Sequence, residues 1–465
     1  MSAVRGPVLF ASIADAGLIN PMLVVAGELA RRGVPELYFA STEDRRRDVE
    51  AIQGRTSVRF ISLGERLERP PGEWDDDTYA AATQPARPRA LTARPQNVIT
   101  YLAKVTDADI MITMYQRMLA EVRKLNPGLM VVDSSSVYPT DAAREHGVPY
   151  VLSVPIAVSE VFADRLPLSY PSPNSGLPGQ LSLRQRLANL RFRLSLLRGL
   201  LTKVPAADFT RRRREAGISN ASASQSKYAD DARAIVGYSV FGMEYPFSAA
   251  PSHLHMVGPV VPPLPEAAEP DPALRDWLDG HESIVYLAFG THMRMRPEQV
   301  TAVIDAVRRL GPEHHLLWKL PRRQQEMLPA DLPANLRVEH WVPSQLEVLN
   351  HPHVRVYFNH GGGNSAYEGI YFGKPGLVQP FWMDCYDHAA RVADSGTSLV
   401  LSYQDTLSGE RIAAALRRLL REPEFTTRAR EWAERFRAAG GASAAADVIL
   451  DACRADEPVL TEAAT

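Results

Sequence analysis

The alternation of short apolar runs with helix-length segments constrains the fold of this chain more than any other feature of its sequence. Residues 8–13 have the length of a buried strand, a turn is expected at 15–17, and residues 22–32 place apolar side chains at helical spacing. Residues 36–40 and 129–133 are further runs of strand length. Buried strands that alternate with helices predict an α/β fold, in which helices cover both faces of a parallel sheet.

A proline-rich segment divides the chain into two such units. Residues 258–272 hold prolines at a density that neither a helix nor an inner strand accepts, and a new strand follows at 284–289. We therefore predict two doubly wound, Rossmann-like domains at 1–250 and 266–426, joined by a linker at 251–265. Ligands of such sheets bind at the carboxyl ends of the strands, so the facing edges of the two domains are expected to form a cleft.

Charge and cysteine content exclude several classes of protein. The 465 residues include 52 Lys and Arg against 54 Asp and Glu, a near-neutral balance that gives no reason to expect a nucleic-acid partner. The two cysteines, Cys385 and Cys453, exclude a disulfide scaffold and fit a reducing cytoplasm. The first residues lack the pattern of a signal peptide, and no run of about 18 uncharged apolar residues occurs, so no membrane span is expected.

Residues 183–204 mix leucine with arginine and allow two interpretations. The leucines recur at helical spacing: Leu183, Leu187, Leu190, Leu194 and Leu197. One interpretation is a helix that lies on an anionic membrane surface. We favour the other, an amphipathic helix whose leucine face packs against the protein and whose arginine face meets water.

The most informative segment for chemistry runs from residue 341 to 391. A strand that ends at Phe358 is followed by His360, three glycines and the expected start of a helix at 364–365. Glycines let backbone N–H groups approach an anion closely, and a helix N-terminus adds further N–H groups and a favourable dipole. A phosphate or pyrophosphate is therefore the expected guest.

Other side chains of this segment suit the rest of a nucleotide sugar. Trp341 offers a flat surface to a base, Glu368 can accept hydrogen bonds from ribose hydroxyls, and Asp384 can accept them from a sugar. A lone glycine cluster is by default only a tight strand-to-helix turn. Here an aromatic ring, an imidazole, the glycines and two carboxylates fall in one short window, which favours a binding site.

This window resembles the donor-binding signature of family 1 glycosyltransferases, the UDP-glycosyltransferases of plants, animals, fungi and bacteria. The resemblance rests on residues 341–345, 360–365, 368, 373–375 and 380–384, and a looser likeness extends over the whole chain. It implies a GT-B fold, with the acceptor bound mainly by the first domain, the UDP-sugar by the second, and C-terminal helices at 427–465 crossing back onto the first. It also implies inverting transfer with the UDP-sugar as co-substrate and no metal or other cofactor.

The resemblance assigns a donor role to most residues of the signature. Trp341 would stack on uracil, with Gln345 beside the nucleoside. Glu368 would hold the ribose, and Asp384 the sugar hydroxyls. The pyrophosphate would be held by residues of two loops: His360, Gly363, Asn364 and Ser365 from one, with Gly290 and Thr291 facing it from the other.

Two departures from the family pattern concern the donor. The spacing from Trp341 to Gln345 is one residue longer than usual, which leaves the register of base stacking open. Cys385 stands where relatives typically carry Gln or His against the sugar, so the identity of the sugar is open, with glucose as the default. We expect Cys385 to be a small apolar side chain in the sugar pocket, because nothing in the sequence indicates an activated thiolate.

A third departure concerns the catalytic base. In the acceptor loop, Leu18 follows Gly17 at the place where family members usually carry the His that takes the proton from the acceptor. Leucine cannot accept a proton. Asp133 matches the carboxylate that normally orients this His, although a strand-end Asp more often caps the next turn.

Four explanations of the missing His remain open. Asp133 acts as the base, directly or through a water, or Asp15 does so instead. Alternatively, the acceptor is an amine or an acidic phenol that needs no base, or the protein binds a nucleotide sugar but transfers little. His292 is a weaker candidate, since a lone His is more often a surface or packed residue.

The leading hypothesis is an inverting transferase that moves a hexose onto a small, hydrophobic acceptor, a natural product or a xenobiotic. The irregular, proline-rich stretches at 66–95 and 164–179 are the candidate acceptor loops. A catalytically weak helper or regulatory protein is the alternative, and an epimerase of the same fold is less favoured because the window is typical of transferases. The sequence leaves the oligomeric state open.

Overall fold

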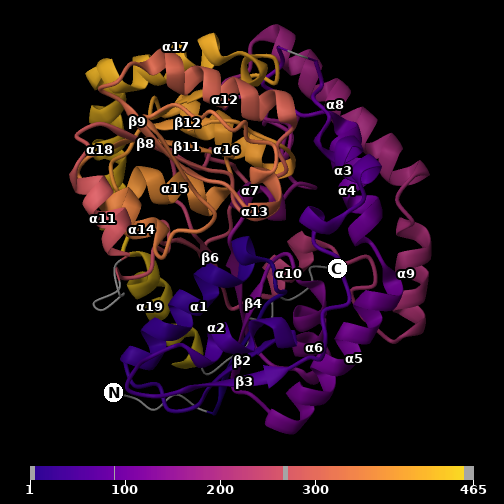
Figure 1. Cartoon of the computed structure of the whole chain (residues 1–465). Coiled ribbons are helices and arrows are strands. Elements are labelled where there is room, and N and C mark those ends of the chain that lie inside the picture. Colours follow the sequence, from indigo (N-terminus) through magenta and orange to yellow (C-terminus); the bar gives the residue numbers. More distant parts are fainter. Residues whose placement is uncertain (1–5, 88, 265–270, 455–465) are drawn as a thin grey trace.

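The computed structural model describes residues 6–87, 89–264 and 271–454. It contains two α/β units, each built on one parallel sheet, which lie one above the other in Figure 1. The predicted segments 1–250, 251–265, 266–426 and 427–465 each include residues outside the described ranges, namely 1–5, 88, 265–270 and 455–465.

The first sheet has, within the described residues, the strand order β3-β2-β1-β4-β5-β6-β7. Its strands are β1 (Val8–Ala11), β2 (Leu37–Ser41), β3 (Val58–Ser62), β4 (Leu129–Asp133), β5 (Tyr150–Val154), β6 (Ala234–Gly237) and β7 (Leu254–Met256). In β1, Val8 pairs in parallel with Leu37 of β2 and with Leu129 of β4. All residues of β1, β4 and β5 are buried, as expected for strands covered by helices on both faces.

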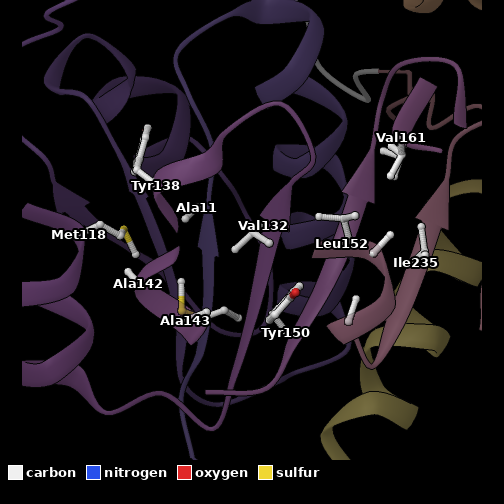
Figure 2. Packing of buried hydrophobic residues seen from close by; sticks show 14 of the residues in the cluster. Ala11, Met118, Val132, Tyr138, Ala142, Ala143, Tyr150, Leu152, Val161 and Ile235 are labelled. Atoms are coloured by element: carbon white, nitrogen blue, oxygen red, sulfur yellow. The ribbon is translucent and has the colours of Figure 1, made fainter. Parts of the chain in front are cut away.

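Helices cover both faces of this sheet. The helices of the first domain are α1 (Ala16–Arg31), α2 (Arg46–Glu50), α3 (Asp76–Thr83), α4 (Pro95–Val105), α5 (Ala108–Leu125), α6 (Val137–His146), α7 (Val158–Val161), α8 (Leu183–Thr202), α9 (Ala206–Glu215) and α10 (Gln225–Asp231), with short 3-10 turns at Glu43–Arg45 and Pro71–Glu73. Of these, α3, α4 and α8 pack against one another and against residues of the second domain. Figure 2 shows part of the core, where Met118 of α5 and Ala142 of α6 face Val132 of β4.

The second sheet has the order β10-β9-β8-β11-β12-β13 in the described part of the chain. Its strands are β8 (Ile284–Ala288), β9 (His315–Lys319), β10 (Leu336–Glu339), β11 (Val354–Asn359), β12 (Gly376–Val378) and β13 (Ser398–Val400). Its helices are α11 (Pro272–Asp279), α12 (Pro297–Leu310), α13 (Arg322–Gln325), α14 (Gln345–Asn350), α15 (Gly363–Tyr371), α16 (Met383–Asp394) and α17 (Gly409–Arg421), with a 3-10 turn at Asp405–Leu407. The two strand orders confirm the predicted pair of doubly wound domains.

Two C-terminal helices connect the domains. α18 (Pro423–Ala438) is followed by a sharp turn at Gly440 and Gly441, both with positive φ, and α19 (Gly441–Arg454) then lies beside α1 of the first domain in Figure 1. The side chains of Ala445, Ala446 and Ile449 pack into the core of that domain. The first sheet also continues through β7 to Met256, beyond the boundary expected at residue 250.

Helix α1 begins earlier than the sequence pattern predicts. The turn expected at 15–17 is its first turn: Asp15 is the N-cap residue, and Pro21 lies inside the helix. A proline in a helix leaves the carbonyl four residues earlier without its usual N–H donor. Here that carbonyl belongs to Gly17, and it accepts a hydrogen bond from Nδ2 of Asn364 at 3.1 Å. The second domain thus supplies the bond that Pro21 removes.

Helix α8 corrects a second expectation. The predicted helix forms, but the predicted leucine face does not pack against the protein, since Leu183, Leu187, Leu190, Leu194, Leu197 and Leu201 are 41% to 84% exposed. Leu196, on the opposite face, packs against the cluster of Phe192. The buried face consists of Asn189, Phe192 and Gly199. Gly199 lies so close to Ile99 of α4 that a Cβ at this position would overlap the isoleucine. This close approach of α4 decides which face of α8 turns inward.

Candidate functional site

The loops at the carboxyl ends of β8 and β11 enclose the ring of His360. A Cβ on Gly362 would lie 2.5 Å from Nε2 of His360, and a Cβ on Gly290 would lie 2.9 Å from its Cε1. A side chain at either position would therefore force the imidazole ring or the loop to shift. Burial lowers the pKa of His360 to about 4, so its imidazole is neutral at pH 7. Among the described residues, its Nδ1 has no hydrogen-bond partner.

Helix α15 begins directly after this glycine loop. Its N-cap residue is Gly362, and Gly363, Asn364 and Ser365 form its first turn, as the sequence indicates. The N–H groups of a first turn have no partner within the helix and point along its axis. The structure therefore brings these residues together with His360 at the end of β11, and Thr291 follows Gly290 in the facing loop.

A second group of predicted residues gathers at the side of α15. Nε2 of Gln345 donates to Oε2 of Glu368 at 2.8 Å, and Nζ of Lys319 lies 5.2 Å from the ring centre of Trp341. Trp341 is 61% exposed, so one face of the indole is free to receive a planar ligand. Burial raises the pKa of Glu368 to about 7, although Gln345 and Lys319 act in the opposite direction. The sequence did not single out Lys319.

Asp384 and Cys385 lie in the first turn of α16. Oδ2 of Asp384 lies 3.6 Å from Nε2 of His388, one turn further along the helix. Burial, with the neighbouring Asp387, raises the pKa of Asp384 to about 6. Cys385 is buried, and burial raises the pKa of its thiol well above its ordinary value, so the side chain is a neutral thiol.

Helix α16 is anchored to the first domain by a buried ionic network. Nη2 of Arg391 donates to Oε1 of Glu244 at 2.8 Å, and the backbone N–H groups of Asn174 and Gly176 donate to the carboxylate of Asp387, each at 2.7 Å. Asn174 and Gly176 belong to the irregular stretch 164–179. The sequence did not identify this network, because its members are far apart along the chain.

A further carboxyl group lies beside this network. Oε1 of Glu160, in α7, accepts a hydrogen bond from Nδ2 of Asn174 at 2.8 Å. Burial, together with the charges of Asp384 and Asp387, raises the pKa of Glu160 to about 8. The sequence gave no signal for this residue.

Asp133 is fully buried at the end of β4. Its Oδ1 accepts from the backbone N–H groups of Ser135 and Ser136 at 2.8 and 3.0 Å, and its Oδ2 accepts from the N–H of Ile13 at 3.3 Å and from the hydroxyl of Ser136. The carboxylate therefore caps the turn after β4 and ties it to the loop after β1.

Asp15 lies in a different environment at the start of α1, two residues before Gly17. Its Oδ1 lies 2.6 Å from Nη2 of Arg66 and 3.8 Å from Nε2 of His292. His292 belongs to the second domain and follows Thr291 in the loop after β8. Burial lowers the pKa of His292, although the charge of Asp15 acts in the opposite direction. Asp15 and His292 thus face each other across the domain boundary, close to Leu18.

An aromatic cluster adjoins this pair. Trp382, just before α16, lies 6.1 Å from Trp74, 6.2 Å from Tyr79 and 6.0 Å from Tyr101 between ring centres, and 6.5 Å from His292. Trp74 and Tyr79 belong to the stretch 66–95, which carries the short helix α3, and Tyr101 belongs to α4. The sequence predicted this stretch as an acceptor loop but did not identify the aromatic residues.

The structure yields two findings that concern metals and membranes. Within the described ranges, no group of three or more His, Cys, Asp or Glu side chains is arranged to hold a metal ion. The helices described there also include none that is long and apolar enough to cross a membrane.

Comparisons with known proteins give a consistent result. Residues 159–431 match the family model described as "UDP-glucoronosyl and UDP-glucosyl transferase". The chain is 24% identical to glycosyltransferase sdnJ of Sordaria araneosa over 97% of its own length and 99% of that protein. The structure is similar to that of the kitacinnamycin glycotransferase, with a TM-score of 0.68, 19% identity, and coverage of 96% of this chain and 98% of the other. It is also similar to UDP-glucose: anthocyanidin 3-O-glucosyltransferase in complex with UDP, with a TM-score of 0.64, 18% identity, and coverage of 96% and 98%.

Proposed function

The chain belongs to the UDP-glucoronosyl and UDP-glucosyl transferase family, and from this premise we propose that it moves a hexose from a UDP-sugar onto a small, hydrophobic acceptor with inversion of configuration. Its two parallel-sheet domains have the GT-B arrangement of family 1 glycosyltransferases. The observation that carries the proposal is the neutral ring of His360 between two glycine loops, at the open N-terminus of α15.

This arrangement suits a diphosphate leaving group. The first-turn N–H groups of α15 and the helix dipole stabilise the negative charge that develops on UDP as the sugar leaves. A neutral imidazole at His360 adds a hydrogen-bond donor without a fixed charge. Trp341 would stack on the base, and Glu368 beside Gln345 would accept from the ribose hydroxyls. These groups provide charge stabilisation from the protein itself, which supports transfer without a metal.

The aromatic cluster supports a hydrophobic acceptor. The rings of Trp74, Tyr101 and Trp382 lie between the first domain and the start of α16, where Asp384 would hold the sugar. Two similar structures are named for kitacinnamycin and for an anthocyanidin, which supports a natural product as acceptor. Cys385 stands beside Asp384 in place of the usual Gln or His, so the identity of the hexose stays open.

We infer that His292 and Asp15 replace the missing His as the base. A neutral His292 takes the proton from the acceptor hydroxyl as its oxygen attacks the anomeric carbon, and the carboxylate of Asp15 stabilises the resulting imidazolium. Arg66 holds Asp15 in place. Asp133 is less suited to this role because its carboxylate is enclosed and already accepts several hydrogen bonds.

Release of UDP from UDP-sugars, with alcohols, phenols and amines as acceptors, tests this assignment. We expect Asp15→Asn and His292→Gln each to lower kcat with alcohols by about 100-fold or more, in the range of general-base effects. The rise in Tm caused by UDP should not change, because neither residue is one of the predicted donor-binding residues (Gly290, Thr291 and the residues from Trp341 to Cys385), called the donor group below. Asp133→Asn is the matched control. It should lower the free energy of unfolding, whereas kcat of the folded protein should stay close to that of the wild type.

Other outcomes select among the alternatives. Full activity of His292→Gln, with turnover confined to amines and acidic phenols, would establish base-free transfer. A rise in Tm with UDP but no turnover until Leu18→His is introduced would favour the helper hypothesis. The absence of any effect of UDP on Tm would contradict the donor site itself.

A further inference from the structure

We propose that the exposed leucines of α8 dock this protein on an anionic lipid bilayer. Six leucines form the α8 stripe: Leu183, Leu187, Leu190, Leu194, Leu197 and Leu201. Their spacing of alternately four and three residues places them within about 80° of the helix circumference, as successive residues are about 100° apart. Isolated exposed leucines need no explanation, but six on one line form a continuous apolar surface.

Arginine side chains flank this stripe on both sides. Residues 183–202 hold five arginines and no Asp or Glu, so the whole helix carries positive charge. Arg184, Arg191 and Arg198 lie along one side of the stripe and Arg186 along the other, and all four are exposed. Arg193 is tied instead to the backbone carbonyls of the loop at 166–170. The chain as a whole is close to neutral, so this charge is a local feature.

The inner face of α8 fixes the stripe in its outward position. Asn189 accepts from the N–H of Ser172 and donates to the carbonyls of Leu168 and Tyr170. On the same face, Phe192 packs in a cluster with Val98 of α4 and Tyr386 of α16. Figure 1 shows α8 at the outer edge of the molecule, next to α3 and α4. The leucines therefore cannot turn inward without breaking these contacts.

Charge decides which partner fits the stripe. A second copy placed with its stripe against this one would bring arginine opposite arginine, which is unfavourable. A neutral apolar groove would leave the guanidinium groups without counter-charges. An anionic bilayer satisfies both features, because leucines enter the boundary of the acyl chains while arginines extend to the lipid phosphates.

The position of α8 gives this docking a consequence for the site. Tyr386, against which Phe192 packs, directly follows Cys385 at the predicted sugar pocket. A bilayer on the outer face of α8 would lie one helix diameter from this region, where an acceptor dissolved in lipid has a short path. Only this consequence rests on the proposed function, since the docking itself depends on α8 alone.

Flotation of the full chain with lipid vesicles tests the proposal. The probes are vesicles of phosphatidylcholine alone and of equal parts phosphatidylcholine and phosphatidylglycerol. We expect binding to the anionic vesicles only, weakened by salt. The variant Leu190→Ser/Leu194→Ser/Leu197→Ser should bind about 100-fold more weakly or worse. Arg184→Gln/Arg191→Gln/Arg198→Gln should bind about 100-fold more weakly, because each arginine contributes about fivefold near an anionic surface.

Two controls keep the outcome specific. Leu407→Ser changes a leucine of the second domain that is 41% exposed, and it should bind like the wild type. Circular dichroism and the Tm rise with UDP should be unchanged in all variants, because every substituted side chain is exposed. Absence of binding to either vesicle, or equal binding by the leucine variant, would overturn the proposal. A dimer in scattering that the leucine variant dissociates would also overturn it, because a second copy would then cover the stripe.

Discussion

At the scale of single residues, the site holds three carboxyl groups whose pKa values are raised by burial into the range around pH 7. The pKa is raised to about 8 in Glu160, about 7 in Glu368 and about 6 in Asp384, in each case chiefly by burial. A ligand rich in hydroxyl groups can exchange hydrogen bonds with a carboxyl in either protonation state. Raised pKa values are common at functional sites, and they make stability depend on pH.

Glu368→Gln should flatten the fall in stability between pH 5 and pH 7. The folded protein holds a proton on Glu368 up to about pH 7, whereas the unfolded chain releases it near pH 4.5. Stability therefore falls as pH rises through this window, by at most about 3 kcal/mol for a shift of this size. Glutamine cannot ionise, yet its amide oxygen can still accept from Gln345. Denaturant unfolding at a series of pH values measures the effect.

The control for this experiment is Glu298→Gln, which changes an exposed carboxylate at the start of α12. Its stability should follow pH as the wild type does. If the curves of Glu368→Gln and the wild type were parallel from pH 5 to pH 8, the raised pKa of Glu368 would be refuted.

That the predicted donor-binding residues from 341 to 385 lie near one another could be predicted, because they are close together in the sequence. Strand, glycine loop and helix follow one another between residues 354 and 371, so one window fixes their relation in space. The pair of Asp15 and His292 could not be predicted in the same way. Asp15, Arg66 and His292 come from three separate segments of two domains, and only the assembled fold brings them together.

At the scale of elements, the type of a helix was easier to predict than its bounds or orientation. Helix α1 was expected only from residue 22, where the apolar spacing begins, yet the bond from Asn364 to Gly17 lets the helix continue past Pro21. Helix α8 was predicted correctly as a helix, but its inner face was not. Periodicity identifies an apolar face and does not tell whether protein, lipid or water lies against it.

Gly362→Ala should show whether the glycine loop needs glycine at this position for space beside His360 or for its backbone conformation. The φ angle of Gly362 is −62°, which alanine adopts without strain. Its Cβ, however, would lie 2.5 Å from Nε2 of His360, so the ring or the start of α15 must move. We expect the affinity for UDP to fall about tenfold or more, which corresponds to about 1.4 kcal/mol. Calorimetric titration with UDP measures this change.

Gly27→Ala serves as the matched glycine substitution. Gly27 lies inside α1, and a Cβ there would be 3.5 Å from the nearest atom, an ordinary contact. Alanine should stabilise this helix slightly and leave the affinity for UDP unchanged. Equal affinities of both variants for UDP would contradict the role assigned to the loop.

At the scale of the whole molecule, the sequence analysis predicted two domains and C-terminal helices that cross between them, but not the buried ionic contacts that join the domains. The proline-rich segment and the repeated strand-helix pattern indicate two separate sheets. The buried contact between Glu244 and Arg391 joins residues 147 positions apart. Arg391 lies at the end of the recognised window, yet no local pattern points to a partner in the other domain.

The contact between Glu244 and Arg391 makes folding of the two domains interdependent. Exposure of the two side chains is 0% and 4%, and Glu244 also accepts from the hydroxyl of Ser159 at 2.9 Å. Removal of the Glu244 charge leaves the buried Arg391 without its hydrogen-bonded carboxylate and with Asp387, 3.8 Å away, as its remaining counter-charge. Breaking a buried ion pair typically costs about 3 to 5 kcal/mol. We therefore expect Glu244→Gln to lower the free energy of unfolding by about 3 kcal/mol or more in denaturant titrations.

A second ion pair across the same domain boundary provides the comparison. Nη1 of Arg294 lies 2.9 Å from Oδ1 of Asp76, but Asp76 is 98% exposed, so Asp76→Asn should leave stability unchanged.

The variant Glu244→Gln should also lower kcat more than it lowers the affinity for UDP. The donor group lies within the second domain, whereas Asp15 and His292 meet only when both domains keep their relative positions. Equal stability of the two variants would mean that the buried contact does not hold the domains together, and that packing of α19 on the first domain sets their arrangement instead.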